Sequence, residues 1–165
     1  MTWIKSVAMA VLLAACCGRI YDFRGANIPA DVNSFSVEFF NNDAPLVNPQ
    51  LSILFTEKLK TKFQTESRLK LVAEQGDFRF SGAITDYRIS QASLDENGAA
   101  QNQLNITVHV VFFAGTHAEK NYEKDYVFFK TYKADQEFSG IENDLSAEIS
   151  DVIVQKIYAD VALDW

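Results

Sequence analysis

The sequence is poor in the residue types that most catalytic and metal sites need. It holds two histidines and two cysteines among 165 residues. His109 and His117 stand in no H-E-x-x-H or Cys-His spacing, and the chain contains no G-x-S-x-G motif. Its seven glycines are scattered among turns and form no phosphate-binding loop. The sequence therefore predicts a protein that is not an enzyme and that carries no metal and no cofactor.

Basic residues are scarce relative to acidic ones. Fifteen lysines and arginines stand against 22 aspartates and glutamates, which gives a formal net charge of -7. Nucleic-acid-binding proteins need basic stripes that neutralise phosphates, so the composition excludes general binding to nucleic acid. Hydrophobic residues nonetheless make up 48% of the chain and aromatic residues 13%. This composition predicts a single globular domain with a sizeable core.

The two cysteines are adjacent, and they follow a short apolar run. Lys5 precedes the apolar residues 7–13, which are too few to span a bilayer. Small residues come next, so the layout is that of a secretory signal peptide. Adjacent cysteines bridge each other only with strain, and no third cysteine offers a partner. An ordinary secreted protein with two spare thiols remains the alternative to a lipid-modified one.

Residues 13–16, Leu-Ala-Ala-Cys, resemble the bacterial lipobox, in which the cysteine thiol receives a diacylglyceryl group and the signal is cut before it. The resemblance implies a signal peptide at residues 1–15 and lipidation at Cys16, with Cys17 as the poorer match. Two or three acyl chains, palmitate among them, hold a protein stably on a membrane. The residue after Cys16 is not the aspartate that marks inner-membrane retention. We therefore expect an outer-membrane protein, anchored on the periplasmic side.

The rest of the chain divides into an approach segment, residues 16–33, and one domain, residues 34–165. Alternating apolar residues predict a strand over 34–40 with Phe35, Val37 and Phe39 on one face. Asn48 and Pro49 then open an amphipathic helix that ends after Phe63.

Five further elements follow along the sequence. Residues 68–71 predict a short strand, and 78–89 a longer one whose apolar phase slips after Asp86, as at a bulge. A polar hairpin loop containing Asn97-Gly98 leads to a strand over 104–112, and another strand covers 122–132. Ser139 and Glu142 form a capping box before a final helix with an apolar stripe to Val161.

This order predicts an α+β fold. Each helix needs an apolar surface on which to bury its stripe, so the economical arrangement is a two-layer sandwich. Two helices pack on one face of a mixed, mostly antiparallel sheet of four to five strands. The first strand-helix-strand unit crosses over right-handedly.

The opposite face of that sheet is then left without a helix. If Ile106, Val108 and Val110 point toward the helices, the exposed parity carries His109 and several apolar residues. An uncovered apolar face is typical of a docking surface. The candidate docking residues are Val111, Phe113, Val127 and Phe129. The alternative is that the approach segment or the long hairpin loop folds over them.

Basic residues suggest a second kind of contact. Arg68 and Lys70 share one short predicted strand, and Lys124 and Lys130 lie on the last one. Lysine and arginine at strand edges can pair with the phosphates of an anionic lipid. The alternative is that edge lysines only prevent sheets from aggregating.

Several short strings of the sequence carry a family resemblance through their order along the chain; they are residues 17–25, 28–29, 36–42, 44–49, 76–77 and 82–87. Together with the lipobox they resemble the LptE family, the lipoproteins of lipopolysaccharide assembly. The chain resembles the form from the Bacteroidetes lineage over nearly its whole mature length. The resemblance implies a two-layer sandwich lodged as a plug inside the outer-membrane barrel LptD, where it aids barrel assembly and binds lipopolysaccharide.

A rival resemblance leads to a different binding role. The succession of strand, helix, Leu69–Val72 and a Gly-Asp turn into Phe80–Thr85 is similar to lipoproteins of the curli-secretion and penicillin-binding-protein-activator type. These are outer-membrane lipoproteins that assemble secretion pores or stimulate wall synthases. Recovery of the partner from the native membrane separates the two alternatives.

Overall fold

The computed structural model describes residues 27–165 except 47, 95, 97 and 164. The predicted signal peptide, both cysteines and the first part of the approach segment lie outside the described residues, as does Asn97 of the predicted turn.

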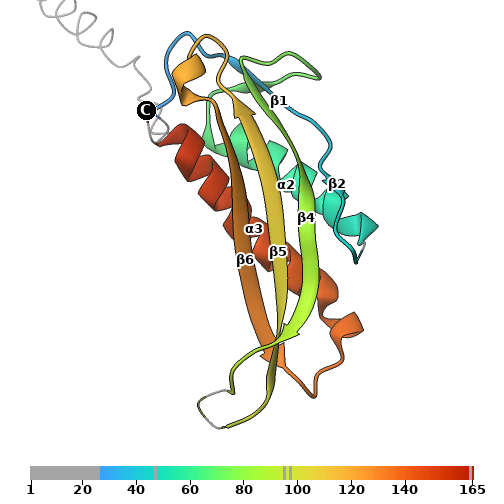
Figure 1. Cartoon of the computed structure of the whole chain (residues 1–165). Helices are drawn as coiled ribbons and strands as arrows, with labels where there is room; N and C mark the ends of the chain where they lie inside the picture. Colours follow the sequence, from blue (N-terminus) through green and yellow to red (C-terminus); the bar gives the residue numbers. More distant parts are fainter. Residues whose placement is uncertain (1–26, 47, 95, 97, 164) are drawn as a thin grey trace, which may run out of the picture.

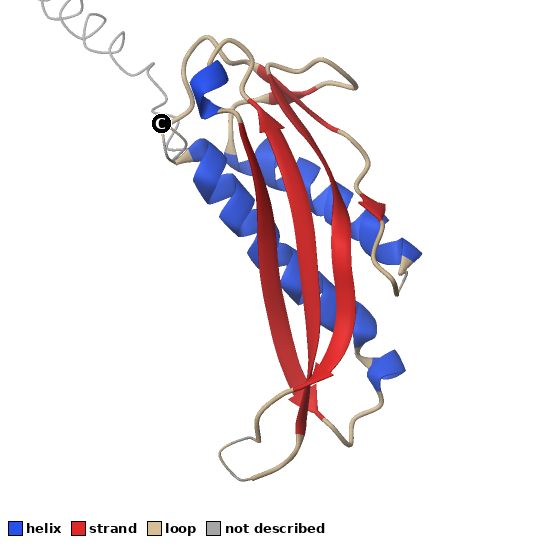
Figure 2. Ribbon diagram, in the orientation of Figure 1, coloured by secondary structure: helices blue, strands red, loops and turns tan. Residues whose placement is uncertain are grey.

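The described chain forms the predicted α+β sandwich, with two long helices against one face of a sheet (Figures 1 and 2). The apolar stripes of both helices face this sheet, so the core lies between the two layers. The strands are β1 (Ser34–Val37), β2 (Asn41–Asn42), β3 (Lys70–Leu71), β4 (Phe78–Gln91), β5 (Gln101–Phe113) and β6 (Tyr122–Lys133). The long helices are α2 (Pro49–Glu66) and α3 (Glu142–Ala162), and short 3-10 helices cover η2 (Ala118–Lys120) and η3 (Phe138–Gly140).

The six-stranded sheet has the order β3-β1-β4-β5-β6, and β2 also pairs with β4. β1 runs parallel to both β3 and β4, whereas β4, β5 and β6 are antiparallel neighbours. The sheet is therefore mixed, and its longest strands are antiparallel. β6 forms one edge along its whole length, and β3 forms a very short edge on the other side.

The predicted strand over 34–40 is divided, and one of its assignments was wrong. Phe39 is 53% exposed, whereas Phe40 is fully buried. The backbone N–H of Phe40 donates to Oγ1 of Thr56 on α2, at 3.2 Å, instead of joining a strand ladder. The break between β1 and β2 thus shifts the alternation of buried and exposed side chains by one residue. As a result Phe40 lies in the core, and Phe39 points to solvent.

The phase slip on β4 is a real irregularity of the ladder. The register with β5 shifts between Ile84 and Asp86, as predicted from the sequence. An extra residue in one strand turns the following side chains to the other face. Tyr87 consequently points toward the helices and is 1% exposed.

The two helices run in the same direction across the sheet (Figure 1). Asn48 begins α2 as predicted, since its Oδ1 accepts from the N–H groups of Gln50 and Leu51 at 3.0 and 3.3 Å. Two hydrogen bonds between the helices agree with this parallel arrangement. Asn48 at the start of α2 donates to Glu142 at the start of α3, and the Tyr158 hydroxyl near the end of α3 donates to the carbonyl of Glu66 at the end of α2.

The predicted capping box of α3 was wrong. Oγ of Ser139 donates to Glu137 at 3.2 Å, and the helix begins without a side-chain cap. Oε1 of Glu142 instead accepts from the Tyr87 hydroxyl at 2.6 Å and from Nδ2 of Asn48 at 2.8 Å. The η3 turn moves the helix start away from Ser139, and the Glu142 carboxylate joins both helix starts to β4.

Candidate functional site

The sheet face that points away from the helices carries the residues predicted for docking, and we call it the open face. Ile106, Val108 and Val110 are at most 1% exposed and face the helices, which confirms the predicted parity. On the open face Val127 is 55% exposed and Phe129 50%. Figure 2 shows both long helices behind the three long strands and none in front of them.

Within the described chain, neither predicted cover lies over the open face. Residues 27–33, the described end of the approach segment, pack at one end of the sandwich, where the N–H of Asn27 donates to the Ala162 carbonyl at 2.7 Å. The loop between β4 and β5 projects beyond the opposite end of the sheet (Figure 1). Val127 and Phe129 therefore keep their exposure.

The apolar residues of the open face form two groups. Val111 and Phe113 lie near the end of β5, where the guanidinium of Arg79 stacks 3.9 Å from the centre of the Phe113 ring. Val127 and Phe129 lie on the edge strand β6. Arg79 covers part of the first group, so the second group is the more accessible one.

A charged cluster separates the two groups. Nδ1 of His109 lies 2.7 Å from Asp125, and its Nε2 lies 3.1 Å from Glu123. The imidazole of His109 thus lies between the carboxylates of Asp125 and Glu123, and this cluster places polar groups at the centre of the open face.

An amide ladder that sequence reasoning missed lies beside Phe129. Nε2 of Gln103 donates to Oδ1 of Asn105 at 3.0 Å, and Nδ2 of Asn105 donates to Oγ of Ser90 at 2.9 Å. The signal was present in the sequence, because residues 103 and 105 share the parity of His109 on one strand. The open face thus combines apolar, amide and charged regions.

The four predicted lipid-binding cations do not form one patch. Lys70 lies on β3 and Arg68 just before it, whereas Lys124 and Lys130 lie on β6 at the opposite edge of the sheet. The placement of Arg68 on the short strand was wrong, since that strand contains Lys70 and Leu71 alone. Lys70 is exposed and makes no ion pair with any other described residue.

Lys124 and Lys130 turn under the sheet toward α3. Nζ of Lys124 lies 2.6 Å from Asp160, and Lys130 pairs with Glu148. The Tyr126 hydroxyl also donates to Asp160, at 2.7 Å. Burial favours the neutral form of Asp160, but the hydrogen bonds from Lys124 and Tyr126 outweigh it and lower the pKa of this carboxyl. These contacts fasten the edge strand to the helix.

The same cluster raises the pKa of two phenols. Burial is the main cause at Tyr122, whose pKa rises to about 12. Burial and the bonds to Tyr122 and Asp160 also raise the pKa of Tyr126. Both hydroxyls stay neutral at physiological pH, and the Tyr126 hydroxyl lies within hydrogen-bond distance of Tyr122, at 2.9 Å, as well as of Asp160.

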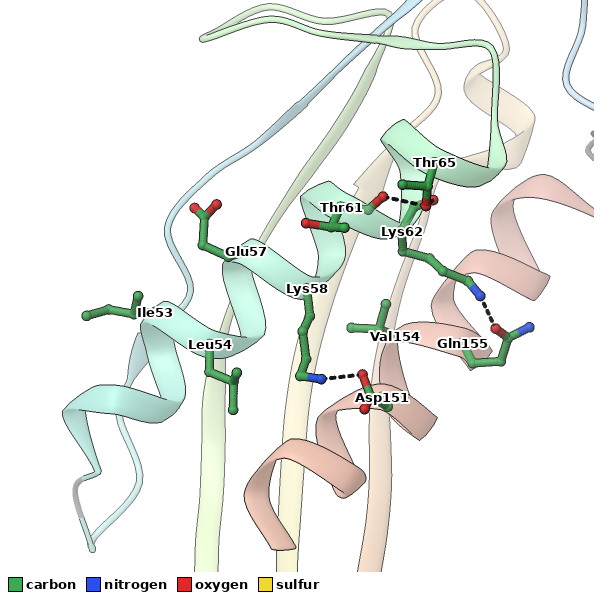
Figure 3. A pocket seen from close by; sticks show the side chains of 10 residues that line it. All are labelled: Ile53, Leu54, Glu57, Lys58, Thr61, Lys62, Thr65, Asp151, Val154 and Gln155. Atoms are coloured by element: carbon green, nitrogen blue, oxygen red, sulfur yellow. Dashed lines mark hydrogen bonds and ion pairs between the residues drawn. The ribbon is translucent and has the colours of Figure 1, made fainter. Parts of the chain in front are cut away.

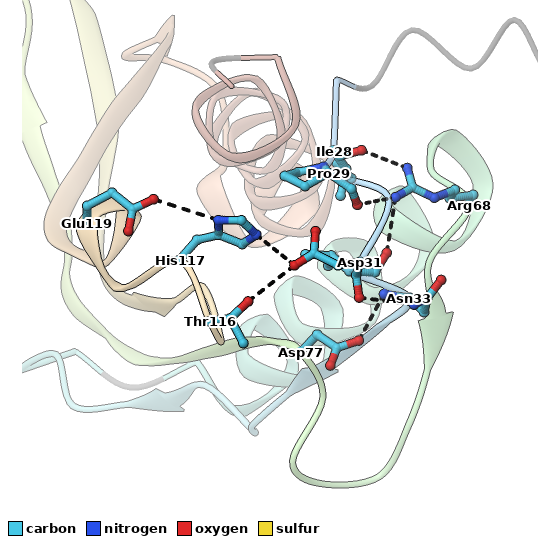
Figure 4. Close-up of polar contacts among 10 residues, drawn as sticks. Ile28, Pro29, Asp31, Asn33, Arg68, Asp77, Thr116, His117 and Glu119 are labelled. Atoms are coloured by element: carbon cyan, nitrogen blue, oxygen red, sulfur yellow. Dashed lines mark hydrogen bonds and ion pairs between the residues drawn. The ribbon is translucent and has the colours of Figure 1, made fainter.

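Arg68 holds the described end of the approach segment. Its guanidinium donates to the carbonyl oxygens of Ile28 at 2.9 Å, of Val32 at 3.1 Å and of Pro29 (Figure 4). Ile28 and Val32 are 6% and 2% exposed, so this segment is packed as well as hydrogen-bonded. We call residues 27–33 the arm.

Two carboxylates fix the arm from the other side (Figure 4). Oδ2 of Asp31 lies 3.0 Å from Nε2 of His117, and Oδ2 of Asp77 accepts from the N–H groups of Asn33 and Ser34, both at 2.9 Å. These backbone hydrogen bonds, Asn33 first, lower the pKa of Asp77. A hydrogen bond from its own backbone, followed by that from His117, lowers the pKa of Asp31.

A shallow groove runs between the outer surfaces of α2 and α3 (Figure 3). Its volume is about 700 Å³, and its apolar lining comes from Ile53, Leu54 and Val154. Lys58 pairs with Asp151 across the groove, and Lys62 reaches Gln155. The lysines that line it are already engaged within the molecule.

Neither metal ligands nor a membrane span stand out in the described part of the chain. Residues 27–165, with the four gaps given above, contain no group of three or more histidine, cysteine or acidic side chains that could hold a metal ion. Among the same residues no helix combines the length and the apolar character needed to cross a bilayer.

Comparison with known proteins gives one family match and several structural ones. The family described as "LptE: Lipopolysaccharide-assembly" matches residues 32–161. No match was found among curated proteins.

Three of the solved structures that match this chain are lipoproteins or hypothetical proteins from bacteria. A minor lipoprotein from Acinetobacter baumannii has a TM-score of 0.56 at 13% identity, over 81% of this chain and 94% of that chain. Hypothetical protein CT253 from Chlamydia trachomatis has a TM-score of 0.54 at 10% identity, over 79% and 98%. Rare lipoprotein B from Shewanella oneidensis has a TM-score of 0.46 at 14% identity, over 77% and 95%. At these identities the first two establish a common fold.

Proposed function

The chain belongs to the LptE family of lipopolysaccharide-assembly lipoproteins, and from this premise we propose that it docks with an LptD-type outer-membrane β-barrel. In this proposal it plugs the barrel, supports barrel assembly and assists the delivery of lipopolysaccharide to the cell surface. The observation that carries the proposal is the open face, where Val127 and Phe129 are half exposed beside polar and charged groups.

The composition of the open face suits the inner wall of a barrel. The interior of outer-membrane barrels is polar, and a protein interface combines apolar contacts with hydrogen-bonding groups. The amide ladder of Gln103 and Asn105 and the His109 cluster supply hydrogen-bonding groups, and Val127 and Phe129 supply the apolar contact.

The length of the sandwich also supports a plug. The 13 residues of β5 span roughly 44 Å at about 3.4 Å per residue. The apolar band of an outer-membrane barrel is about 25 Å tall. The sandwich is therefore long enough to reach from one rim of this band to the other.

Anchoring in the outer membrane through Cys16 is part of the same proposal. Residue 27 follows Cys16 by eleven positions, and an extended chain covers at most about 3.6 Å per residue. The tether then reaches no further than about 40 Å. Such a tether keeps the arm end of the sandwich close to the periplasmic surface of the membrane.

Direct contact with lipopolysaccharide is the other half of the proposal. The candidates are Arg68, Lys70, Lys124 and Lys130. Arg68, Lys124 and Lys130 already bind groups within the protein and would have to release them to bind lipid phosphates. Lys70 would not have to break such a contact. Lys70→Glu should therefore weaken photocrosslinking to lipopolysaccharide. Lys156→Glu, at an exposed lysine on α3, is the matched control.

Affinity purification from the native membrane tests the docking proposal. We expect the full-length protein to recover an LptD-type barrel, and Val127→Asp or Phe129→Asp to reduce that recovery. Ile53→Asp is the control, since Ile53 is 58% exposed on α2 in the other layer. Repeated recovery of a wall synthase, or of a secretion pore built from the protein itself, would contradict docking and favour the adaptor alternative.

A further inference from the structure

The edge strand β6 is long, regular in its pairing and paired on one side only within the described chain. It covers Tyr122–Lys133, and its register with β5 continues over twelve residue pairs without a shift. No other strand of the described chain pairs with its outer side. A long regular edge offers unpaired backbone N–H and C=O groups to another strand, and proteins usually protect such an edge with bulges or free lysines.

That protection is weak in this protein. Lys124 and Lys130 are drawn under the sheet to Asp160 and Glu148 on α3, so their charges are turned away from the open face. On that face Val127 and Phe129 are 55% and 50% exposed directly at the edge. An apolar pair beside free backbone groups favours the addition of a strand.

The β6 sequence is complementary to itself when two copies run antiparallel. With Phe128 opposite the partner's Phe128, Val127 lies opposite the partner's Phe129. In the same register Glu123 lies opposite the partner's Lys133, and by symmetry each of these contacts occurs twice. Cross-strand pairs of apolar residues and of opposite charges are the contacts that stabilise sheets.

Each neighbouring register loses both of these contacts. A shift in one direction places Val127 opposite itself and Phe129 opposite the partner's Asp125. A shift in the other direction places Phe129 opposite itself and leaves Glu123 beyond the end of the partner's strand at Lys133. One register therefore satisfies the apolar pair and the charged pair together.

We propose that two copies of this protein form a two-fold dimer through antiparallel pairing of their β6 strands in this register. The dimer joins the two sheets into one and leaves all four long helices on the same side. It makes Val127 and Phe129 cross-strand neighbours of the partner's Phe129 and Val127, and the proposed docking with a barrel uses the same two residues. The dimer rests on the edge strand β6 alone and does not depend on the docking proposal.

Charge exchange tests the pairing and its register. The full-length protein in detergent is measured by light scattering after size-exclusion chromatography, over a range of concentrations. Glu123→Lys alone and Lys133→Glu alone each place like charges at both ends of the interface. Each should raise the dimer dissociation constant about tenfold, and the double variant should restore it.

Mixing the two single variants supplies a second readout. In a mixed dimer both charge pairs are again of opposite sign, so the heterodimer should form in preference to either homodimer. Val127→Thr should weaken all forms, and Ile53→Thr on α2 should change none. A monomer at every concentration would overturn the proposal, and so would single and double variants that dimerise equally. A far-UV circular dichroism melt on each variant verifies that it is folded.

Discussion

Nζ of Lys124 and Oδ2 of Asp160 lie 2.6 Å apart, and this pair joins the edge strand of the sheet to the last helix. The Tyr126 hydroxyl shares the same carboxylate at 2.7 Å. A lysine that alternates along an edge strand thus serves the packing of the two layers. The pair also makes the junction sensitive to pH, because it depends on an ionised carboxylate.

We expect Asp160→Asn to lower the melting temperature at pH 7 and to have little effect near pH 3. The pKa of Asp160 is lowered in the folded state, so its stabilising effect is present above the unfolded pKa and is lost as the pH falls through the folded one. Thermal melts at both pH values measure the difference. Asp135→Asn, at an exposed residue after β6, is the control. Equal losses at both pH values would show that the charge of Asp160 contributes nothing.

Asp77→Ala should lower the free energy of unfolding by about 1–3 kcal/mol, because it leaves the N–H groups of Asn33 and Ser34 without their acceptor. Asp77→Asn keeps one carbonyl oxygen and should cost less. Urea unfolding measures both. The lowered pKa of Asp77 adds a pH dependence of the same sign as that of Asp160, with stability lost as the pH falls below the unfolded value. If the alanine and asparagine variants unfold at the same urea concentration as the wild type, Asp77 does not hold the arm.

Arg68→Lys should release the arm without unfolding the domain. Lysine lacks the planar guanidinium group with its several N–H donors, so it cannot donate to the carbonyls of Ile28, Pro29 and Val32 at the same time. Hydrogen exchange should become faster at the backbone amide of Val32 and stay unchanged in the core of β5. Lys70→Arg, which exchanges the same two cationic residue types at an exposed position nearby, is the matched control. Unchanged exchange at Val32 in the Arg68 variant would mean that burial of Ile28 and Val32 suffices to hold the arm.

Gly82→Ala should be severely destabilising, by more than about 2 kcal/mol. A Cβ at Gly82 would lie 2.0 Å from the carbonyl oxygen of His109, and the residue has a φ of +151°. Gly140→Ala is the control, because a Cβ there would meet no atom within 4 Å. Expression level and thermal melting distinguish the two. A Gly82 variant with near-normal stability would show that β4 and β5 can separate locally at this point.

Much of the layered fold could be predicted from local pattern. The start of α2 at Asn48, the irregularity after Ile84 and the inward parity of Ile106, Val108 and Val110 all follow from spacing within one element. Side-chain parity is a local property of a strand, and capping is a local property of a helix. Such features need no knowledge of distant residues.

The interaction partners of the charged residues could not be predicted in the same way. Lys124 and Asp160 are 36 positions apart, and Glu142 and Tyr87 are 55 apart. A lysine on an edge strand has the same local pattern whether it meets a helix, a lipid or water. The capping box failed for this reason, since Glu142 found partners on another element.

The hydrogen bonds between Arg68 and the arm also affect how the domain responds to mechanical tension. If the chain is anchored at Cys16, any tension between the membrane and the domain enters through residue 27, where it meets the hydrogen bond from the Asn27 N–H to the Ala162 carbonyl and then the three carbonyl contacts of Arg68. Beyond them the load passes to Asp77 and into β1, which lies between β3 and β4 and is pulled along its own length. Strands loaded in shear share the force over several hydrogen bonds at once. The sandwich can therefore be held at one end by its tether while its long strands and the loop at the other end stay undistorted.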